Sequence, residues 1–537
     1  MNEFDISIIG GGVAGQTLAL QLKKQMPKSK IVILERASFP IPDAPIKVGE
    51  STVEISSHYF AEVLGYRNHL EKKQLPKLGL RYFSPHSGQN DITKRFELGS
   101  NTFFPRKTYQ IDRQRFEVFL YQECKKKKIT FRDDAYIRDV KLSPENEPHL
   151  ISYVKDKEKF DIKSKWIIDA SGRASVLQSK LNLKVESKHN INAVWFRIKS
   201  KINIDDWSDN KKWKAENSKP GKSRWFSTNH LMGEGYWVWL IPLSRGSTSV
   251  GIVADPRFHP LSEMNSFDKA VKWLEKHEPQ CAKAVVKEKA KLEDFLALKK
   301  FSKCSSQVYS QDRWALTGDA GIFIDPLYSP GMDFVAYSNT FITDFVTRES
   351  KGKRVNSLIK IYNDLFISLT ENTFQVYQDN YAVLKNPQLT TVKIIWDFAV
   401  YWAFIAFLFN HEKSCDISLL GRFSEDLKLV TSLHHRMQEF FREWNKLKSP
   451  VLERKFVDLS KVKLLMDLNK SLMKKFSDAK FDQKLSANIQ MLQDLGQEIF
   501  ATVGKNYPAL SKKVKLDKKL KNKNYLKSVF KLLDMKI

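Results

Sequence analysis

The sequence predicts an α/β protein with a parallel sheet near the N-terminus, a second β-rich region and a helical C-terminal region. Residues 4–9, FDISII, form an apolar run of strand length that leads through a glycine-rich turn into a segment of helical periodicity. Aromatic and β-branched runs such as YWVWLIP indicate a β-sheet over about 186–300. From about residue 346 glycine is scarce and helical patterns dominate. We therefore expect a core over 1–345 and a helical lobe over 346–537.

Length and charge limit the class of protein without choosing it. The 537 residues suffice for a large core with an attached lobe. The net charge of +28 comes mostly from lysine, and such a charge suits nucleic acid, anionic membranes or acidic proteins, although an AT-rich genome also enriches lysine. The four cysteines lie far apart without a CxxC spacing, which predicts reduced thiols, a cytoplasmic location and no zinc site.

Two segments bear on targeting. The chain begins with polar residues and enters a strand at once, so we expect no signal peptide. The apolar stretch FAVYWAFIAFLF, residues 398–409, is too short to span a bilayer, so we expect no transmembrane segment. It is either a buried helix or the lining of an apolar pocket.

The first turn, GGGVAG, has the spacing of a dinucleotide-binding loop. Gly10, Gly12 and Gly15 follow a strand and open a helix, so the first permits the tight turn, the second admits a pyrophosphate and the third allows close packing. A second strand, KIVILER, ends at Glu35, about twenty residues on, where a ribose-binding carboxylate is needed.

Three later segments identify the dinucleotide as FAD by resemblance. QIDRQRFEVFL is similar to the segment with which group A flavoprotein hydroxylases present an arginine to FAD, here Arg113. WIIDASGRAS resembles the second dinucleotide-facing turn of that superfamily, and WALTGDAGIFIDP resembles its third FAD motif, with Asp319 at the ribitol. The implied fold is an FAD-binding, Rossmann-like domain of the glutathione-reductase type. No second GxGxxG follows, so no NAD(P)H domain is visible.

Trp237 and Trp239 lie two residues apart in a strand-like run that ends at Pro242. Both indoles would project from one face of a strand, and this pattern alone fits an ordinary core as well as a functional wall. WVWLIP also matches the WxWxIP motif of flavin-dependent halogenases, and the chain is similar to that family over roughly its first 345 residues.

Three further motifs carry this resemblance. FIDPLYSPG fits the pattern Phe-x-x-Pro-x-x-Ser-x-Gly, KVGEST resembles the flavin strap with Glu50 and Ser51, and LPKLGLRYF supplies the lysine of the family as Lys77. The resemblance implies that halide is oxidised at the flavin to hypohalous acid, which passes through a tunnel to Lys77. Trp237 and Trp239 would form a tunnel wall that discourages direct oxygen transfer to the substrate.

The chain departs from the tryptophan-specific pattern at two positions. Tyr328 stands where those enzymes carry a glutamate before Ser329, and a phenol is a weaker base than a carboxylate, which favours an electron-rich substrate such as a phenol, pyrrole or indole. Pro330 has no N–H to offer a halide, whereas Gly331 and Met332 do. We therefore expect relaxed halide choice, with bromide or iodide competing with chloride.

The C-terminal region is less informative. The lysine-rich end of the chain, residues 511–537, is a candidate amphipathic helix that either faces solvent or docks to an acidic carrier protein or an anionic surface, with nucleic acid disfavoured. His434 and His435 lack acidic or cysteine neighbours that would indicate a metal site.

The sequence thus predicts a halogenase that uses halide and reduced FAD from a separate flavin reductase to modify a small aromatic substrate, free or tethered to a carrier. An aromatic monooxygenase or a reductase of the same fold is the alternative, and a non-catalytic FAD-fold protein is a third. The predicted site residues are Lys77, Tyr328 and Ser329 (catalytic); Gly10, Gly12, Val13, Ala14, Gly15, Glu35, Arg36, Glu50, Ser51, Arg113, Asp319 and Met332 (cofactor); Pro330 and Gly331 (halide); and Trp237 and Trp239 (tunnel wall).

Overall fold

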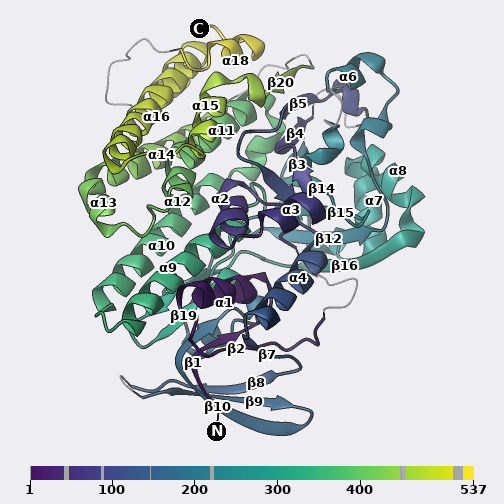
Figure 1. The fold of residues 1–537 in the computed structure, drawn as a ribbon. Coiled ribbons are helices and arrows are strands. Elements are labelled where there is room, and N and C mark those ends of the chain that lie inside the picture. Colours follow the sequence, from purple (N-terminus) through teal and green to yellow (C-terminus); the bar gives the residue numbers. More distant parts are fainter. Residues whose placement is uncertain are drawn as a thin grey trace. The chain divides into compact units, whose positions relative to one another are not determined.

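The computed structural model describes residues 2–40, 48–85, 90–144, 147–217, 223–447, 452, 454–511 and 524–537 (Figure 1). The chain divides into two compact units, and each unit joins segments that are distant in sequence. Unit 1 comprises Met1–Lys72, Ile111–Lys188 and Phe301–Thr373, and unit 2 comprises Lys73–Gln110, His189–Lys300 and Phe374–Ile537. The linear division at residue 345 stays a prediction.

Unit 1 is built on the parallel sheet that the first strand and turn predict. Its strands lie in the order β18–β19–β10–β1–β2–β7, and β8 and β9 extend β10 as an antiparallel ribbon. β1 pairs in parallel with both β10 and β2, and the helix Val13–Gln25 makes the crossover from β1 to β2. The bounds are β1 Asn2–Ile9, β2 Ile31–Leu34, β7 Thr130–Arg132, β8 Tyr136–Lys141, β9 His149–Lys155, β10 Glu158–Asp169, β18 Tyr309–Ser310 and β19 Trp314–Leu316.

The helices of unit 1 pack around α1, which follows the glycine turn. α1 contacts both α4 and α9. Asn339 on α9 donates from Nδ2 to the Ala14 carbonyl and to Thr17 Oγ1, each at 3.1 Å, and this fixes the register of α9 on α1. The bounds are α1 Val13–Gln25, α2 Glu54–His58, α3 Arg67–Lys73, α4 Arg113–Lys126, α5 Val176–Lys180, α9 Gly331–Ser350 and α10 Asn356–Tyr377, and a small ribbon pairs β11 Lys184–Val185 with β17 Cys304–Ser305.

Unit 2 contains the second sheet, in the order β16–β12–β15–β14–β13–β4–β5–β20. Apolar side chains from the sheet and from α7 and α8 form one buried cluster, which includes Val238, Ile252 and Trp273. The sheet extends beyond the expected 186–300, because β4, β5 and β20 join it from outside that range. The bounds are β4 Leu80–Ser84, β5 Phe96–Gly99, β12 Asn192–Ile198, β13 Thr228–Gly233, β14 Tyr236–Pro242, β15 Thr248–Ala254, β16 Leu292–Leu298, β20 Phe456–Asp458, α6 Lys211–Ala215, α7 Phe267–His277 and α8 Pro279–Lys287.

The C-terminal part of unit 2 is mostly helical, as predicted. Residues 387–410 form a continuous helical stretch that is 24 residues long and apolar enough to cross a membrane by length and composition, and 78% of its most apolar window is buried inside the protein. This stretch contains the apolar run 398–409 and extends beyond it, because α11, a π-helical segment Tyr401–Ile405 and α12 follow one another without a break. The bounds are α11 Pro387–Val400, α12 Ala406–Asn410, α13 Ile417–Arg422, α14 Ser424–Asn445, α15 Lys463–Ser471, α16 Asp478–Asn506, α17 Pro508–Ser511 and α18 Lys527–Leu532.

The lysine-rich end is not one helix across its described part. Residues 512–523 lie outside the described residues, and α18 begins only at Lys527. Glu498 on α16 accepts the N–H groups of Tyr525 at 2.7 Å and Leu526 at 2.9 Å, and Phe530 is buried. The final residues are therefore anchored to α16, because apolar side chains interrupt the lysine pattern.

Candidate active site

The glycine turn between β1 and α1 is shaped for a ligand at one glycine and for packing at the other two. Gly10 has a φ of +108°, and a Cβ there would lie 2.3 Å from the Ala170 carbonyl oxygen. A Cβ on Gly15 would lie 2.0 Å from the Gly10 oxygen, whereas a Cβ on Gly12 would meet nothing within 4 Å. Gly12 is the N-cap of α1 and has no side chain that could accept hydrogen bonds from the first turn. The N–H groups of Val13 and Ala14 can therefore bind an anion.

Glu35 follows β2 beside this turn. Its carboxylate accepts the N–H of Gly11 at 2.6 Å and the N–H of Ala37 at 2.7 Å. These bonds hold the side chain at the glycine turn, and each carboxylate oxygen keeps acceptor capacity for a ribose hydroxyl. The next residue, Arg36, is exposed.

In unit 1, the segment that resembles the flavin strap, described here from Val48 to Thr52, lies against Arg113 and Met332. Arg113 begins α4, and its Nη1 donates to the Val48 carbonyl. Gly49 has a φ of +90°, and a Cβ there would lie 2.8 Å from both Arg113 Nη1 and Met332 Cε. The N–H of Ile111 donates to the Glu50 carbonyl at 2.7 Å, and Glu50 and Ser51 are buried. The tertiary structure therefore brings together residues that the sequence separates by more than 280 positions.

Asp319 lies in a short turn that packs against the start of α1. The adjacent Gly318 would place a Cβ 3.1 Å from Ala14 Cβ. Burial raises the pKa of Asp319, and the positive charges of Arg173, Arg113 and Lys303 oppose this rise. The Asp319 carboxylate forms no hydrogen bond with any residue that the structure describes, so its oxygens are available to a ligand's hydroxyl groups.

Lys303 is a candidate site residue that sequence reasoning missed. Its backbone pairs with Phe323, at the start of the FIDPLYSPG motif, through hydrogen bonds of 2.7 and 2.9 Å. Burial, together with Arg173 and Lys184, lowers the pKa of the Lys303 ammonium to about 8, against the opposing charges of Asp169 and Asp319. No motif contains Lys303, because it reaches the site by strand pairing alone.

The FIDPLYSPG turn ends at the N-terminus of α9. Ser329 has a left-handed φ of +59°, and its N–H donates to the Pro326 carbonyl at 2.9 Å. Pro330 is the N-cap of α9, and its carbonyl accepts the N–H of Asp333 at 2.9 Å. Within the described residues, the N–H groups of Gly331 and Met332 have no acceptor. The helix therefore begins with two unused donors, which is the arrangement that binds a small anion.

Lys77 lies in unit 2, at the end of β3 (Leu75–Lys77), and its side chain is buried. β3 pairs with β6 (Thr108–Gln110), and Lys77 lies opposite Thr108. The following N–H, of Leu78, donates to the Phe226 carbonyl at 2.9 Å. The backbone on both sides of Lys77 is thus held by unit 2.

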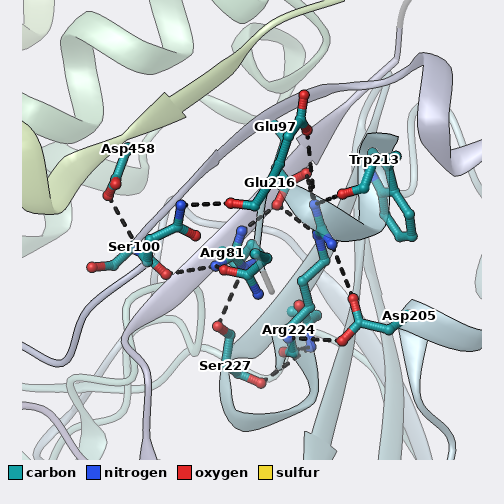
Figure 2. A network of polar contacts seen from close by, with 12 residues as sticks. Arg81, Glu97, Ser100, Asp205, Trp213, Glu216, Arg224, Ser227 and Asp458 are labelled. Atoms are coloured by element: carbon teal, nitrogen blue, oxygen red, sulfur yellow. Dashed lines mark hydrogen bonds and ion pairs between the residues drawn. The ribbon is translucent and has the colours of Figure 1, made fainter. Parts of the chain in front are cut away.

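A buried ion network supports this segment (Figure 2). Glu97 on β5 pairs with Arg81 on β4 and with Arg224, which donates to both Glu97 oxygens at 2.8 and 3.0 Å. Burial raises the pKa of Glu97, but the two guanidinium groups outweigh burial and hold it below its ordinary value. Arg224 precedes Phe226, the acceptor for Leu78, so the network anchors the turn that holds the Lys77 backbone.

We expect Glu97→Gln to destabilise unit 2 by about 3–5 kcal/mol, because it leaves two buried guanidinium groups without their carboxylate. The free energy of unfolding in urea, followed by tryptophan fluorescence, measures the effect. Glu123→Gln is the matched control, since Glu123 pairs with a largely exposed Lys126. A loss for Glu97→Gln no larger than for the control would show that the network contributes little.

An aromatic row follows β4, β13 and β14 in unit 2. His230 is paired with Tyr82 and with Trp239 on its two neighbouring strands. The Tyr82 and His230 rings stack at 4.7 Å, the His230 and Trp237 rings lie 5.3 Å apart, and the two indoles lie 5.7 Å apart. Trp237 Nε1 donates to Tyr381 Oη at 2.9 Å. The two tryptophans share one face, as predicted, and the row continues it into residues that the motif does not include.

The residues of unit 1 fit an FAD molecule. The open space at Gly12, the free donors of the first turn of α1 and the hydrogen-bonding capacity of Asp319 suit a diphosphate and a polyhydroxyl chain. The parallel sheet and its glycine turn are those of a dinucleotide-binding α/β domain. The fold and site therefore define an FAD-dependent flavoprotein.

Comparison with known proteins narrows this class. The family model described as tryptophan halogenase matches residues 5–102 and 104–386, and the chain belongs to that family of flavin-dependent halogenases. It is 26% identical over 435 residues to flavin-dependent halogenase chlA of Dictyostelium discoideum, covering 75% of this chain and 70% of the relative. It is 28% identical over 351 residues to a 1H-pyrrole-2-carbonyl-(peptidyl-carrier protein) chlorinase of Pseudomonas fluorescens, covering 62% of this chain and 73% of the relative.

Solved structures agree with the fold. Halogenase PltM, in a complex with phloroglucinol and FAD, aligns with a TM-score of 0.64 at 15% identity and covers 98% of each chain. The flavin-dependent brominase Bmp2 aligns with a TM-score of 0.57 at 19% identity, over 72% of this chain and 92% of that one. At these identities the likeness confirms the FAD-binding α/β fold with its helical C-terminal region.

Proposed function

We propose that this flavin-dependent halogenase is a two-component enzyme that receives reduced FAD from a separate reductase and halogenates an electron-rich aromatic compound. The observation that supports the aromatic substrate is the row of Tyr82, His230, Trp237 and Trp239 in the same unit as the buried Lys77. The four rings are buried, and aromatic rings favour stacked or edge-to-face contacts, so an aromatic compound suits a site that these rings border. The cytoplasmic location also remains a proposal.

Bound in its reduced form, FAD supplies with dioxygen the oxidising equivalent that converts halide to hypohalous acid. The N–H groups of Gly331 and Met332 hold the halide, and Ser329 shapes the turn in front of them. Lys77 then receives the hypohalous acid. As a hydrogen-bond donor it directs the halogen to the ring, and the hydroxyl group leaves with the ring proton as water; as an amine it forms a haloamine with release of water, and the amine takes up the ring proton when the halogen passes to the ring. Trp237 and Trp239 shield the ring from direct oxygen transfer.

The substrate carries its own activation in this proposal. Tyr328 replaces the glutamate of tryptophan-specific enzymes, so no carboxylate at this position takes the ring proton. A phenol or pyrrole is electron-rich enough to react without that base. Two relatives are named for halogenating a pyrrole held on a peptidyl-carrier protein, which supports testing a carrier-tethered pyrrole here as well.

One assay tests the reaction. Purified protein, FAD, a flavin reductase and NADH are incubated with phenols, pyrroles and indoles and with chloride, bromide or iodide, and products are identified by mass spectrometry. Halogenated product that depends on the protein and on the reductase supports the proposal. Hydroxylated or reduced product without halogen would instead favour a monooxygenase or reductase of the same fold.

We expect bromide or iodide to compete well with chloride, and Pro330→Thr to shift the product ratio toward chloride. Threonine adds an N–H beside those of Gly331 and Met332, and one hydrogen bond to an ion contributes about 1.5–3 kcal/mol, or about one to two decades of affinity. Chloride gains most because it is the most strongly hydrated of the three. Product ratios at equal halide concentrations measure this, and a folded, FAD-binding variant with an unchanged chloride-to-bromide ratio would contradict it.

We expect FAD binding to weaken as the pH rises through about 8, because the free protein then loses the positive charge of Lys303. Bound FAD is an anion and raises the pKa of Lys303, so affinity falls above pH 8 by up to about tenfold for each pKa unit of that rise. Lys303→Gln should bind FAD more weakly at pH 7 and with little change up to pH 9. Equilibrium dialysis with FAD checks this, and parallel pH profiles for the variant and wild type would contradict it.

A further inference from the structure

An open pocket of about 570 Å³ lies along α14 in unit 2, and its lining residues include none of the predicted site residues. Its volume is within the range of about 300–1,000 Å³ that small-molecule sites span. Unlike most such sites, it has polar and charged side chains along its wall. They include Lys428, Thr431, Ser432, Arg436, Glu439 and Arg442. A pocket of this composition suits an ionic ligand better than an apolar one.

The charge of the pocket is positive. Its lining contains three cationic side chains and one carboxylate, that of Glu439. The Lys428 side chain is exposed and forms an ion pair with Glu425 at 2.8 Å, so the Glu425 carboxylate partly neutralises its charge. A guanidinium presents a planar pair of donors that match the oxygens of a phosphate or carboxylate. Arg436 also interacts within the protein, so Arg442 is the residue on which anion binding depends.

Arg442 is the strongest indication of a missing partner. Its side chain is partly buried, and its Nη1 atom is enclosed but has no hydrogen-bond acceptor among the described residues. Burial lowers the pKa of Arg442, and the nearby carboxylates of Asp379, Glu439 and Glu443 only oppose this shift from a distance. Asp379 lies 3.8 Å from Arg257, and Glu443 pairs with Lys446. The guanidinium charge of Arg442 thus has no hydrogen-bonded carboxylate among the described residues, and an anion in the pocket would offset this charge.

We propose that the α14 pocket binds the phosphate group of an organic phosphate ester. Phosphate offers more acceptor oxygens than a carboxylate does, and the pocket offers two arginines together with the hydroxyl groups of Thr431 and Ser432. The ester is either a phosphorylated small aromatic compound or the phosphopantetheine arm of a carrier. The first is a phosphomonoester and the second, on its carrier, a phosphodiester, and both present anionic terminal phosphate oxygens to the pocket. This binding does not require that the protein halogenate anything.

The test is binding to the full-length protein by isothermal titration calorimetry at constant ionic strength. The probes are inorganic phosphate, phenyl phosphate and 4′-phosphopantetheine, with phenol and pantetheine as partners lacking phosphate. We expect the phosphorylated probes to bind and Arg442→Gln to weaken them at least tenfold. Arg422→Gln, which removes an exposed arginine on α13 that pairs with Asp482 at 2.9 Å, should bind like wild type. Tighter binding of phenyl phosphate identifies the small-molecule source, and tighter binding of phosphopantetheine identifies the arm.

A stability measurement separates ligand binding from a structural role. Without phosphate, Arg442→Gln should melt at the same temperature as wild type or slightly higher, because it removes an enclosed donor that has no acceptor. Adding phenyl phosphate should raise the melting temperature of wild type and of Arg422→Gln but not that of Arg442→Gln. Absence of binding by all three phosphorylated probes in wild type overturns the proposal. So does a variant that melts at a lower temperature and still binds them normally, since Arg442 would then be structural.

Discussion

Replacing Lys77 with alanine is expected to abolish halogenation while leaving oxidation of the flavin intact. Lys77 is buried and is not among the candidate cofactor residues, so we expect its removal to leave the FAD contacts unchanged. Catalysis by a positioned side chain contributes about 10²–10⁴-fold, and product formation should fall by at least about 100-fold. NADH consumption and flavin oxidation are followed in parallel with product by mass spectrometry, in the presence of a sulfide that removes free hypohalous acid.

Two control variants test whether the loss of activity is due to the missing amino group of Lys77. Lys77→Met keeps most of the buried volume and should be as inactive as the alanine variant, which excludes a cavity as the cause. Lys72→Ala removes an exposed lysine on the preceding helix α3 and should retain full activity. If Lys77→Met forms product at nearly the wild-type rate with the scavenger present, Lys77 is not the residue that handles the oxidant.

Gly12→Val is expected to prevent FAD binding without unfolding the protein. A Cβ at Gly12 meets nothing within 4 Å, so valine fits the free protein and fills only the space that the diphosphate needs. We expect FAD affinity to fall by at least about 100-fold, which corresponds to about 2.8 kcal/mol. Flavin content after purification and titration of FAD fluorescence measure the loss.

Substitutions at two other glycines show whether the effect is specific to Gly12. Gly15→Val should destabilise the free protein, because its Cβ would collide with the Gly10 oxygen at 2.0 Å. Gly421→Val is the matched control, since a Cβ there also meets nothing within 4 Å and Gly421 lies on α13 in unit 2. Unchanged FAD affinity in a folded Gly12→Val protein would contradict the assignment of this turn to the diphosphate.

Local pattern was enough to predict the parts of this protein that depend on neighbours in sequence. Hydrophobic periodicity and glycine spacing predict the strand, turn and helix around Gly12, and the structure contains all three. Alternation along one strand likewise placed Trp237 and Trp239 on a common face. The FAD-binding α/β fold and the halogenase family could therefore be predicted from the sequence without knowledge of contacts between distant segments.

Contacts between distant segments were decided only by the tertiary structure. Lys303 joins the Asp319 site through strand pairing with Phe323, and β20 adds to β5 from more than 350 residues away. Burial of Glu97 between Arg81 and Arg224 similarly combines charges that no local pattern relates. Such charges are stable inside a protein only when folding brings their partners to them, so their positions depend on the packed whole and not on the segment that carries them.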